Sequence, residues 1–147
     1  MSNTPPELSG RLGHLLKHAQ LRLAELSAQA LAPFGISGRE LAVLLVLAAQ
    51  EAASQQQAAG RLGVDRTTMV AFLDTLEGKG LVARRPDPDD RRRNVVVLTA
   101  KGTQTLRDAT AASDAAERAF LAPLTAPDAA GFRAALRAVA LHDDATA

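Results

Sequence analysis

The feature that most constrains the fold is a pair of short strand-like runs separated by a charged turn. The runs "LVARR" (residues 81–85) and "NVVVL" (residues 94–98) have the composition of β-strands. Between them, "PDPDDRRR" (residues 86–93) combines two prolines, three aspartates and three consecutive arginines. Proline and aspartate both favour turns. The sequence therefore predicts a β-hairpin whose tip carries concentrated charge.

The first part of the chain has helical periodicity. From residue 7 to residue 32, apolar residues recur at steps of three or four, the spacing of one helix face; they are Leu8, Leu12, Leu15, Ala19, Leu23, Leu26 and Ala30. Leu16 and Leu31 widen this face beyond what one small neighbour covers. We therefore expect part of the helix to pack against another subunit. Pro33 and Gly35 end it.

A second helix is predicted to begin after Ser37. Ser37 and Glu40 have the spacing of a capping box, in which each side chain binds the other residue's backbone amide. The apolar run "LAVLLVLAA" (residues 41–49) would fit a buried strand by composition alone. The cap and the continuation to Glu51 favour a helix that is buried nearly all round.

Two short helices joined by a tight turn follow. The first covers residues 55–62 and ends at Gly63, which suits the left-handed position after a helix. The second begins after Asp65, a good N-cap. Ala59 is small where the two helices would cross, and Val64 would fill the angle between them. This arrangement predicts a helix-turn-helix, and the hairpin that comes directly after it would form a wing.

Helices also close the chain. Thr99 can cap a long helix over residues 100–121, and Thr125 or Asp128 can start a last helix that ends near residue 141. The chain contains four Phe, no Trp and no Tyr, so its core must be built from Leu, Val and Ala, which favours packed helices. We therefore predict one domain over residues 1–147, mainly α with a small β-hairpin wing.

Composition excludes several classes of function. The chain has no cysteine, which rules out disulfides, thiol catalysis and Cys-based zinc sites. The longest apolar run, residues 41–49, is too short to span a bilayer. The N-terminal residues lack the basic and apolar segments of a secretory signal. The expectation is a soluble cytoplasmic protein without a membrane partner.

Positive charge is concentrated around the predicted wing. Residues 61–101 contain nine basic and six acidic side chains, whereas the remainder of the chain contains eight basic and ten acidic ones. The local balance is therefore +3 against −2 elsewhere. This asymmetry places positive charge where contact with DNA is predicted. The alternative interpretation of the charged turn is a solvated hairpin without a ligand.

The segment "LGVDRTTMVAFLDTLEGKGLVARRPDPDDRRRNVVVLTAKG" (residues 62–102) resembles the MarR family of transcription regulators, in the order and spacing of its helix-turn-helix, wing and following helix. The resemblance covers essentially the whole chain. It implies a winged helix-turn-helix over residues 36–100 and dimerisation helices over residues 7–33 and 100–142. It also implies a homodimer. By the same resemblance, Asp90 and Arg92 occupy the family's wing motif, and Arg92 is expected in the minor groove.

The recognition helix is expected to bury Met69, Leu73 and Leu76. The candidate DNA-binding residues on its other side are Arg66, Thr67, Thr68, Val70, Ala71 and Asp74. Val70 and Ala71 replace the polar residues that relatives often carry, so contact with thymine methyl groups is what remains available there. Asp74 would repel phosphate, and an intramolecular salt bridge is the favoured interpretation of this residue.

The wing supplies the second set of candidates. Asp90 lies two residues before Arg92 and would share one side of an extended strand with it, so the carboxylate could hold the arginine in place. Arg91 and Arg93 are expected to bind phosphates, and Asp87 and Asp89 to shape the turn. Further contacts with the DNA backbone are predicted for Ser54, Gln55 and Arg84.

The first predicted helix also carries candidate residues for a small-molecule site. His14, His18 and Arg22 step by four along the first helix and share a face. They could bind a small anionic effector, or simply form the solvent or interface side of the helix, and the second interpretation is favoured. No third ligand accompanies the histidine pair, so neither a metal nor a cofactor is predicted.

Together these features predict a homodimeric regulator, most simply a repressor, that binds double-stranded DNA at pseudo-palindromic operators. The alternative is a winged-helix module that binds proteins and has lost specific DNA binding, for which Val70, Ala71 and Asp74 are the best arguments. An enzyme is not predicted, because no nucleophile–base pair, metal motif or phosphate-binding loop is present.

Overall fold

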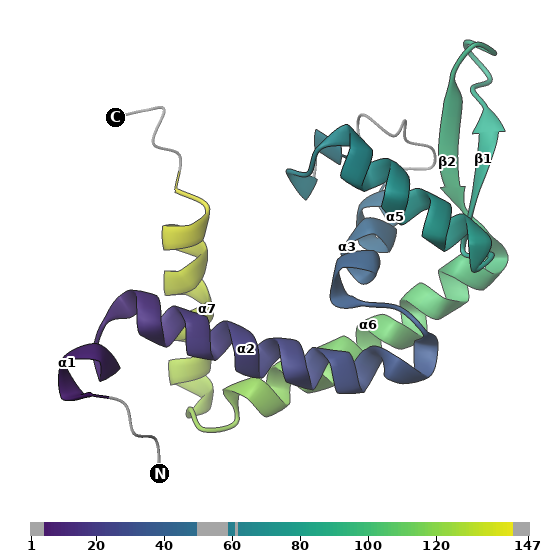
Figure 1. Cartoon of the computed structure of the whole chain (residues 1–147). Helices are drawn as coiled ribbons and strands as arrows, with labels where there is room; N and C mark the ends of the chain where they lie inside the picture. The colour runs from purple at the N-terminus through teal and green to yellow at the C-terminus, as the bar shows by residue number, and fades with distance from the viewer. Residues whose placement is uncertain (1–4, 50–58, 61, 143–147) are drawn as a thin grey trace.

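The computed structural model describes residues 5–49, 59–60 and 62–142 (Figure 1). Its elements are α1 (Pro6–Ser9), α2 (Leu12–Leu31), the 3₁₀-helix η1 (Ala32–Phe34), α3 (Gly38–Ala48), α5 (Arg66–Gly78), β1 (Val82–Pro86), β2 (Asn94–Leu98), α6 (Ala100–Leu121) and α7 (Ala126–Ala140). The predicted fold class, mainly helical with a two-stranded antiparallel hairpin, is confirmed. Most of the helix predicted over residues 55–62 lies outside the described residues.

The two long helices, α2 and α6, pack against each other and form the base of the molecule (Figure 1). Helices α3 and α5 lie on one side of α6, and the hairpin projects from the same end (Figure 1). Helix α7 leaves the other end of α6 and crosses α2 (Figure 1). The element that carries the charged turn is therefore far from the C-terminal helix.

The single helix predicted over residues 7–32 is wrong at its start. Helix α1 ends at Ser9 and α2 begins at Leu12, and the backbone of Arg11 between them is extended, with ψ at 135°. Gly10 costs about 1 kcal/mol relative to alanine inside a helix, so it is a natural place for the break. The apolar spacing did not show this break, because Leu8 and Leu12 keep a step of four across it.

The capping box at the start of α3 is present as predicted. The Ser37 hydroxyl accepts a hydrogen bond from the Glu40 amide, and the Glu40 carboxylate accepts one from the Ser37 amide, both at 3.1 Å. Glu40 is buried and its other oxygen lies 2.8 Å from the Lys79 ammonium, which also donates to the Gly35 carbonyl at 2.7 Å. The start of α3 is thereby bonded to the residue that follows α5.

This network sets the charge of Glu40. Burial would by itself raise the pKa of the Glu40 carboxyl, but hydrogen bonds from Lys79 and Ser37 and the charge of Lys79 outweigh burial. The pKa of Glu40 is therefore below its ordinary value of 4.5. The carboxylate is ionised at neutral pH, as the ion pair with Lys79 requires.

Two tight turns bracket α5, and both depend on glycine. Gly63 has φ at +66° and Gly80 has φ at +74°, a region that residues with a Cβ rarely adopt. At the first turn, the Val64 amide donates to the Ala59 carbonyl at 3.1 Å; at the second, the Leu81 amide donates to Leu76 at 3.0 Å. These are the bonds of a Schellman motif. They confirm the predicted role of Gly63 as the turn before the second helix.

The core lies between α3, α5, the hairpin and α6. Its fully buried large side chains are Leu31, Val43, Leu44, Met69, Leu73, Leu76, Val82 and Val96. Helix α3 is buried on most sides, as predicted, although Leu45 is exposed. The apolar face assigned to α5 from the sequence is the buried face, so its opposite side is free to contact a ligand.

The hairpin forms as predicted, although its first strand covers residues 82–86 instead of 81–85; Val82 lies opposite Leu98 and Pro86 opposite Asn94. Thr99 caps α6 through the Gly102 amide at 3.0 Å, and Thr125 rather than Asp128 caps α7 through the Asp128 amide at 3.2 Å. Gly102 packs directly on the Leu81 backbone, because a Cβ at this position would overlap the Leu81 carbonyl oxygen.

Within the described residues, no single helix is long and apolar enough to cross a membrane. Residues Leu12–Phe34 and Gly38–Ala48 would meet the length and composition needed only as a pair, and they are bent by 69° relative to each other.

Gly102→Ala should lower the free energy of unfolding by about 2 kcal/mol or more, because the new methyl group would collide with backbone that cannot move aside. The matched control is Gly78→Ala in α5, where a Cβ would meet no atom within 4 Å. This control should be neutral, or stabilise by up to about 1 kcal/mol, because alanine is the better helix former. Urea unfolding followed by circular dichroism measures both, and equal stabilities would contradict the close contact.

Candidate nucleic-acid interface

The N-terminus of α5 is ordered by Asp65. Its carboxylate accepts hydrogen bonds from the Thr68 amide at 2.7 Å and from the Thr68 hydroxyl at 3.0 Å. These bonds lower the pKa of Asp65 below its ordinary value. The predicted cap is therefore present, and the hydroxyl of Thr68 is already engaged within the helix.

The exposed face of α5 includes only some of the candidate DNA-binding residues predicted from the sequence. Arg66, Thr67, Ala71 and Asp74 are exposed, whereas Thr68 and Val70 are only half-buried positions at the edge of that face. Thr67, Ala71 and Asp74 follow a spacing of four and three, so they share one stripe of the helix. This stripe presents one hydroxyl, one methyl group and one carboxylate to solvent.

The Asp74 carboxylate is paired inside the molecule, as the sequence favoured. It lies 2.7 Å from one terminal nitrogen of Arg84, and the other terminal nitrogen lies 3.0 Å from Glu77. Arg84, which was predicted to contact the DNA backbone, is thus placed in β1 with its guanidinium held by two carboxylates of α5. Arg84 therefore offsets part of the negative charge of Asp74 and Glu77 before any ligand is present.

The turn of the wing is held by aspartate side chains. The Asp87 carboxylate accepts from the Asp89 amide at 2.9 Å, and the Asp90 carboxylate accepts from the Arg92 amide at 3.1 Å. Backbone bonds from Asp87 to Arg93 and from Arg93 to Asp90 close the loop. An aspartate that accepts from the residue two places later is a recurrent turn motif. The prediction that aspartates shape this turn is correct for Asp87.

One prediction for the wing needs correction. Asp90 and Arg92 were expected on one side of an extended strand, with the carboxylate holding the guanidinium. The structure instead places both residues in the turn between β1 and β2, and Asp90 bonds the backbone amide of Arg92. A two-residue spacing shares a face only in a strand, and proline and aspartate end the strand at Pro86. The backbone of Arg92 is fixed, while its side chain is exposed.

The tip of the hairpin exposes three arginines, Arg91, Arg92 and Arg93, beside two exposed aspartates, Asp89 and Asp90. The hairpin extends away from the helical body beside α5 (Figure 1). An exposed helix face and an arginine-rich hairpin on the same side can reach a major groove and an adjacent minor groove. Ser54 and Gln55, the other predicted backbone contacts, lie outside the described residues.

The predicted small-molecule residues lie together on α2 but serve other contacts. The rings of His14 and His18 are 4.2 Å apart. Arg22 donates to the Phe120 carbonyl at 2.8 Å and to the Ala119 carbonyl at 3.3 Å, and its guanidinium lies over the Phe120 ring. A cation on the last carbonyls of α6 stabilises that helix end. Among the described residues, no group of three or more possible metal-ligating side chains comes together.

A cleft that the sequence did not indicate lies between α2 and the start of α3. Its volume is about 670 Å³, and it is lined by Gln20, Leu23, Ala24, Ser27, Ala28, Ile36, Ser37, Gly38 and Arg39. Arg39 is exposed and brings a positive charge to a mostly apolar wall. The sequence does place Arg39 in the first turn of α3, close to the capping Ser37. It does not show which side of the helix the Arg39 side chain faces, so the cleft could not be predicted.

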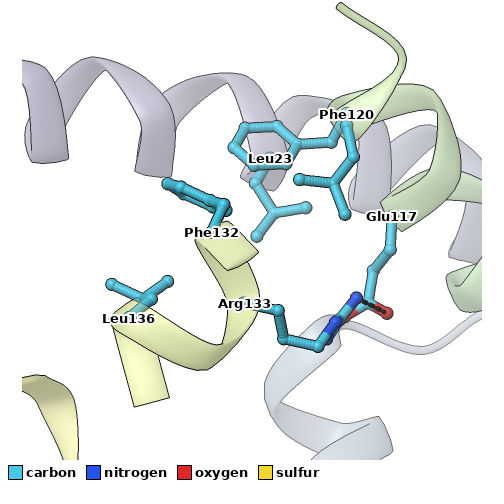
Figure 2. A pocket seen from close by; sticks show the side chains of 7 residues that line it. Leu23, Glu117, Phe120, Phe132, Arg133 and Leu136 are labelled. Atoms are coloured by element: carbon cyan, nitrogen blue, oxygen red, sulfur yellow. Dashed lines mark hydrogen bonds and ion pairs between the residues drawn. The ribbon is translucent and has the colours of Figure 1, made fainter. Parts of the chain in front are cut away.

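An apolar surface covers the opposite end of the molecule. A cavity of about 110 Å³ lies between α2, α6 and α7. Figure 2 shows Leu23, Phe120, Phe132 and Leu136 around it, beside the ion pair of Arg133 and Glu117. Helix α7 has no buried residue in the single chain. Apart from Leu45, the exposed large apolar residues lie on the N-terminal helices or at the C-terminal end: Leu8, Leu12, Leu15, Leu16, Leu21, Leu124, Phe132, Leu136, Val139 and Leu141.

Comparison with known sequences gives one consistent result. The sequence pattern of the MarR family matches residues 36–93. The transcriptional repressor Rv2887 of Mycobacterium tuberculosis is 32% identical over 122 residues, which are 83% of this chain and 88% of that protein. The transcriptional repressor NicR of Pseudomonas putida is 29% identical over 106 residues, or 72% of this chain and 67% of NicR.

Solved structures agree with the sequence comparison. The transcriptional repressor CouR bound to a 23-mer DNA duplex superposes with a TM-score of 0.87 and 35% identity, covering 95% of this chain and 99% of that one. CouR from Rhodococcus jostii RHA1 bound to p-coumaroyl-CoA has a TM-score of 0.79 and 30% identity, covering 97% and 98% of the two chains.

Proposed function

The chain belongs to the MarR family and is a DNA-binding regulator of transcription, and we propose that it acts as a homodimeric repressor that reads DNA with α5 and with the arginines of its hairpin. The observation that carries the proposal is the exposed turn of Arg91, Arg92 and Arg93, at the tip of a hairpin that extends from the helical body beside α5 (Figure 1). The DNA-bound relative CouR has the same overall fold. Arginine suits this position because it stays charged and is weakly hydrated.

In this proposal the helix and the hairpin have different tasks. Arg66 and Thr67, at the N-terminus of α5, bind phosphate or base edges in the major groove. Ala71 offers only a methyl group, which suits contact with thymine. Arg92 enters the minor groove, where a narrow groove concentrates negative potential. Much of the affinity then comes from electrostatics and DNA shape, and less from hydrogen bonds to bases.

The proposed dimer is supported by the exposed apolar residues of α1, α2 and α7. A helix that buries none of its residues in its own chain needs another partner to cover its apolar stripe. A second copy of the chain would supply matching helices, since most oligomers are symmetric. A symmetric dimer would bind a pseudo-palindrome whose half-site centres are about 34–36 Å apart.

The cleft between α2 and α3 is the proposed effector site. It adjoins both a helix of the apolar surface and the helix that packs on α5, so a ligand there would contact the two parts of the molecule that set the spacing of the DNA-binding elements. Arg39 favours an anionic group, and the apolar wall favours an acyl or aromatic body. CouR binds p-coumaroyl-CoA, which combines these features. A ligand would act by preferring a dimer whose recognition helices are wrongly spaced.

Arg92→Ala should weaken binding to operator DNA by roughly 5- to 150-fold, the loss expected for a groove contact worth about 1–3 kcal/mol. Fluorescence anisotropy with a labelled duplex measures the affinity. Arg118→Ala is the matched control, because Arg118 lies near the C-terminal end of α6, far from the hairpin. If Arg92→Ala bound like the wild type, or if wild-type affinity did not depend on salt, the protein-interaction module would become the better proposal.

Val139→Asp should convert the dimer to a monomer and abolish operator binding. Val139 is 77% exposed in the single chain, so the substitution cannot disturb the core, and it shares the stripe of Phe132 and Leu136. Light scattering after gel filtration measures the mass. The control is Ala134→Asp, which lies on the opposite side of α7. Dimer formation by Val139→Asp would place the interface elsewhere.

Arg39→Gln should weaken binding of an anionic effector by about tenfold or more, because a hydrogen-bonded charge pair contributes roughly 1.5–3 kcal/mol. Isothermal titration with p-coumaroyl-CoA and with free p-coumarate measures the effect, and Arg11→Gln serves as a control outside the cleft. Binding of either probe to both variants with equal affinity would contradict this location of the site.

A further inference from the structure

Arg84 in β1 connects the two elements proposed to bind DNA, the hairpin and α5. We propose that Arg84 is a positioning residue that fixes the wing to the recognition helix, and that it does not contact phosphate. The inference rests on the proposed function, because it assumes that α5 and the hairpin bind the same DNA molecule. It gives Arg84 a task that differs from that of the arginines at the tip.

The contacts of Arg84 support this assignment. Its guanidinium binds Asp74 at 2.7 Å and Glu77 at 3.0 Å, one terminal nitrogen to each carboxylate. The two acids are three residues apart and therefore lie on one side of α5. The Arg84 side chain is only 19% exposed, so it is held against the helix. The rigid, planar fork of arginine suits two simultaneous acceptors.

Because of the position of Arg84 in β1, these bonds influence where the tip of the hairpin lies. Arg84 is the central residue of β1 and lies opposite Val96, which is buried in the core. The hairpin continues beyond Arg84 at about 3.3 Å per residue, so the charged turn lies many ångströms further out. A small rotation of the hairpin at Arg84 therefore becomes a large displacement of Arg92 relative to α5.

The same bonds also reduce the negative charge on the exposed face of the recognition helix, α5. The side chains of Asp74 and Glu77 are 63% and 45% exposed. Without a cation beside them, two carboxylates on this helix would repel the phosphate backbone. Arg84 offsets one of these two negative charges from within the molecule, and it does so only while the hairpin stays in place. The partial neutralisation of the helix and the position of the wing therefore depend on the same two ion pairs.

The test uses a substitution for which the two roles predict opposite signs. The variant Asp74→Ala with Glu77→Ala removes two negative charges near DNA and releases Arg84. If Arg84 were a phosphate contact, this variant would bind DNA more tightly. On the positioning proposal it should bind at least about fivefold more weakly, because the wing loses its anchor. Both acids are exposed, so folding is retained; thermal unfolding followed by circular dichroism checks this.

A mutant cycle separates this role from a direct contact of Asp74 with a base. Arg84→Gln should weaken binding by about as much as the double-alanine variant, and combining all three changes should add little, since residues of one network are not additive. Additive losses, or tighter binding by the double-alanine variant, would overturn the proposal. Arg85→Gln is the control, because Arg85 is its exposed neighbour in β1.

The measurement also distinguishes this inference from the proposed function. Wild-type chain and Arg85→Gln must bind the operator for DNA binding itself to stand, whereas the inference concerns only the sign and additivity of changes within the Asp74, Glu77 and Arg84 network. If Arg92→Ala weakens binding but the network variants do not, the proposed function survives and Arg84 is not a positioning residue.

Discussion

The junction between α5, the hairpin and α6 is the constraint on which the rest of the structure depends. Here the carbonyl of Leu81 accepts from the Thr99 amide at 3.1 Å, the Thr99 hydroxyl donates to Gly80 at 2.6 Å, and Lys101 donates to Lys79 at 3.0 Å. Gly102 packs on the same Leu81 carbonyl. Because three elements meet within a few residues, the orientation of the hairpin follows from that of α5 and α6.

The charge around the wing is also determined by short internal contacts. The region with a positive charge balance also contains acidic residues, and most of these are engaged internally. Asp65 caps α5, Asp74 and Glu77 bind Arg84, and Asp87 and Asp90 accept from backbone amides. The arginines at the tip make no such contact with the described residues. Acidic side chains thus hold the turn of the hairpin and its junction with α5, while Arg91, Arg92 and Arg93 remain exposed.

Local sequence patterns predicted the helices and the hairpin because caps and turns depend on residues that are close in the sequence. The capping box of Ser37 and Glu40 and the turn at Gly63 are fixed by residues within a few positions of one another, and the hairpin joins two strands that are adjacent in the sequence. The break at Gly10 was missed because one glycine leaves the apolar spacing unchanged. Asp90 was assigned to the wrong partner atom because the geometry of a strand was assumed where the chain turns.

Features that join distant segments were harder to predict. Arg22 binds carbonyls of residues nearly a hundred positions away, and Arg84 binds two acids across the α5–β1 turn. The sequence favoured an internal salt bridge for Asp74 but did not identify its cation. Arg39 was missed because a cleft between α2 and α3 exists only once the helices are packed. These contacts are decided by how the helices pack. Sequence periodicity predicts only which face of a helix is buried and which is exposed.

The unburied state of α7 has a consequence for how the protein responds to its own abundance. A 15-residue helix with no buried side chain is only marginally stable by itself in water. If association covers it, then its order, the dimer and the folded state share one equilibrium that shifts with protomer concentration. On the proposed dimer, the order of α7 would therefore rise with protomer concentration, beyond what its ion pair with Glu117 of α6 provides in the single chain.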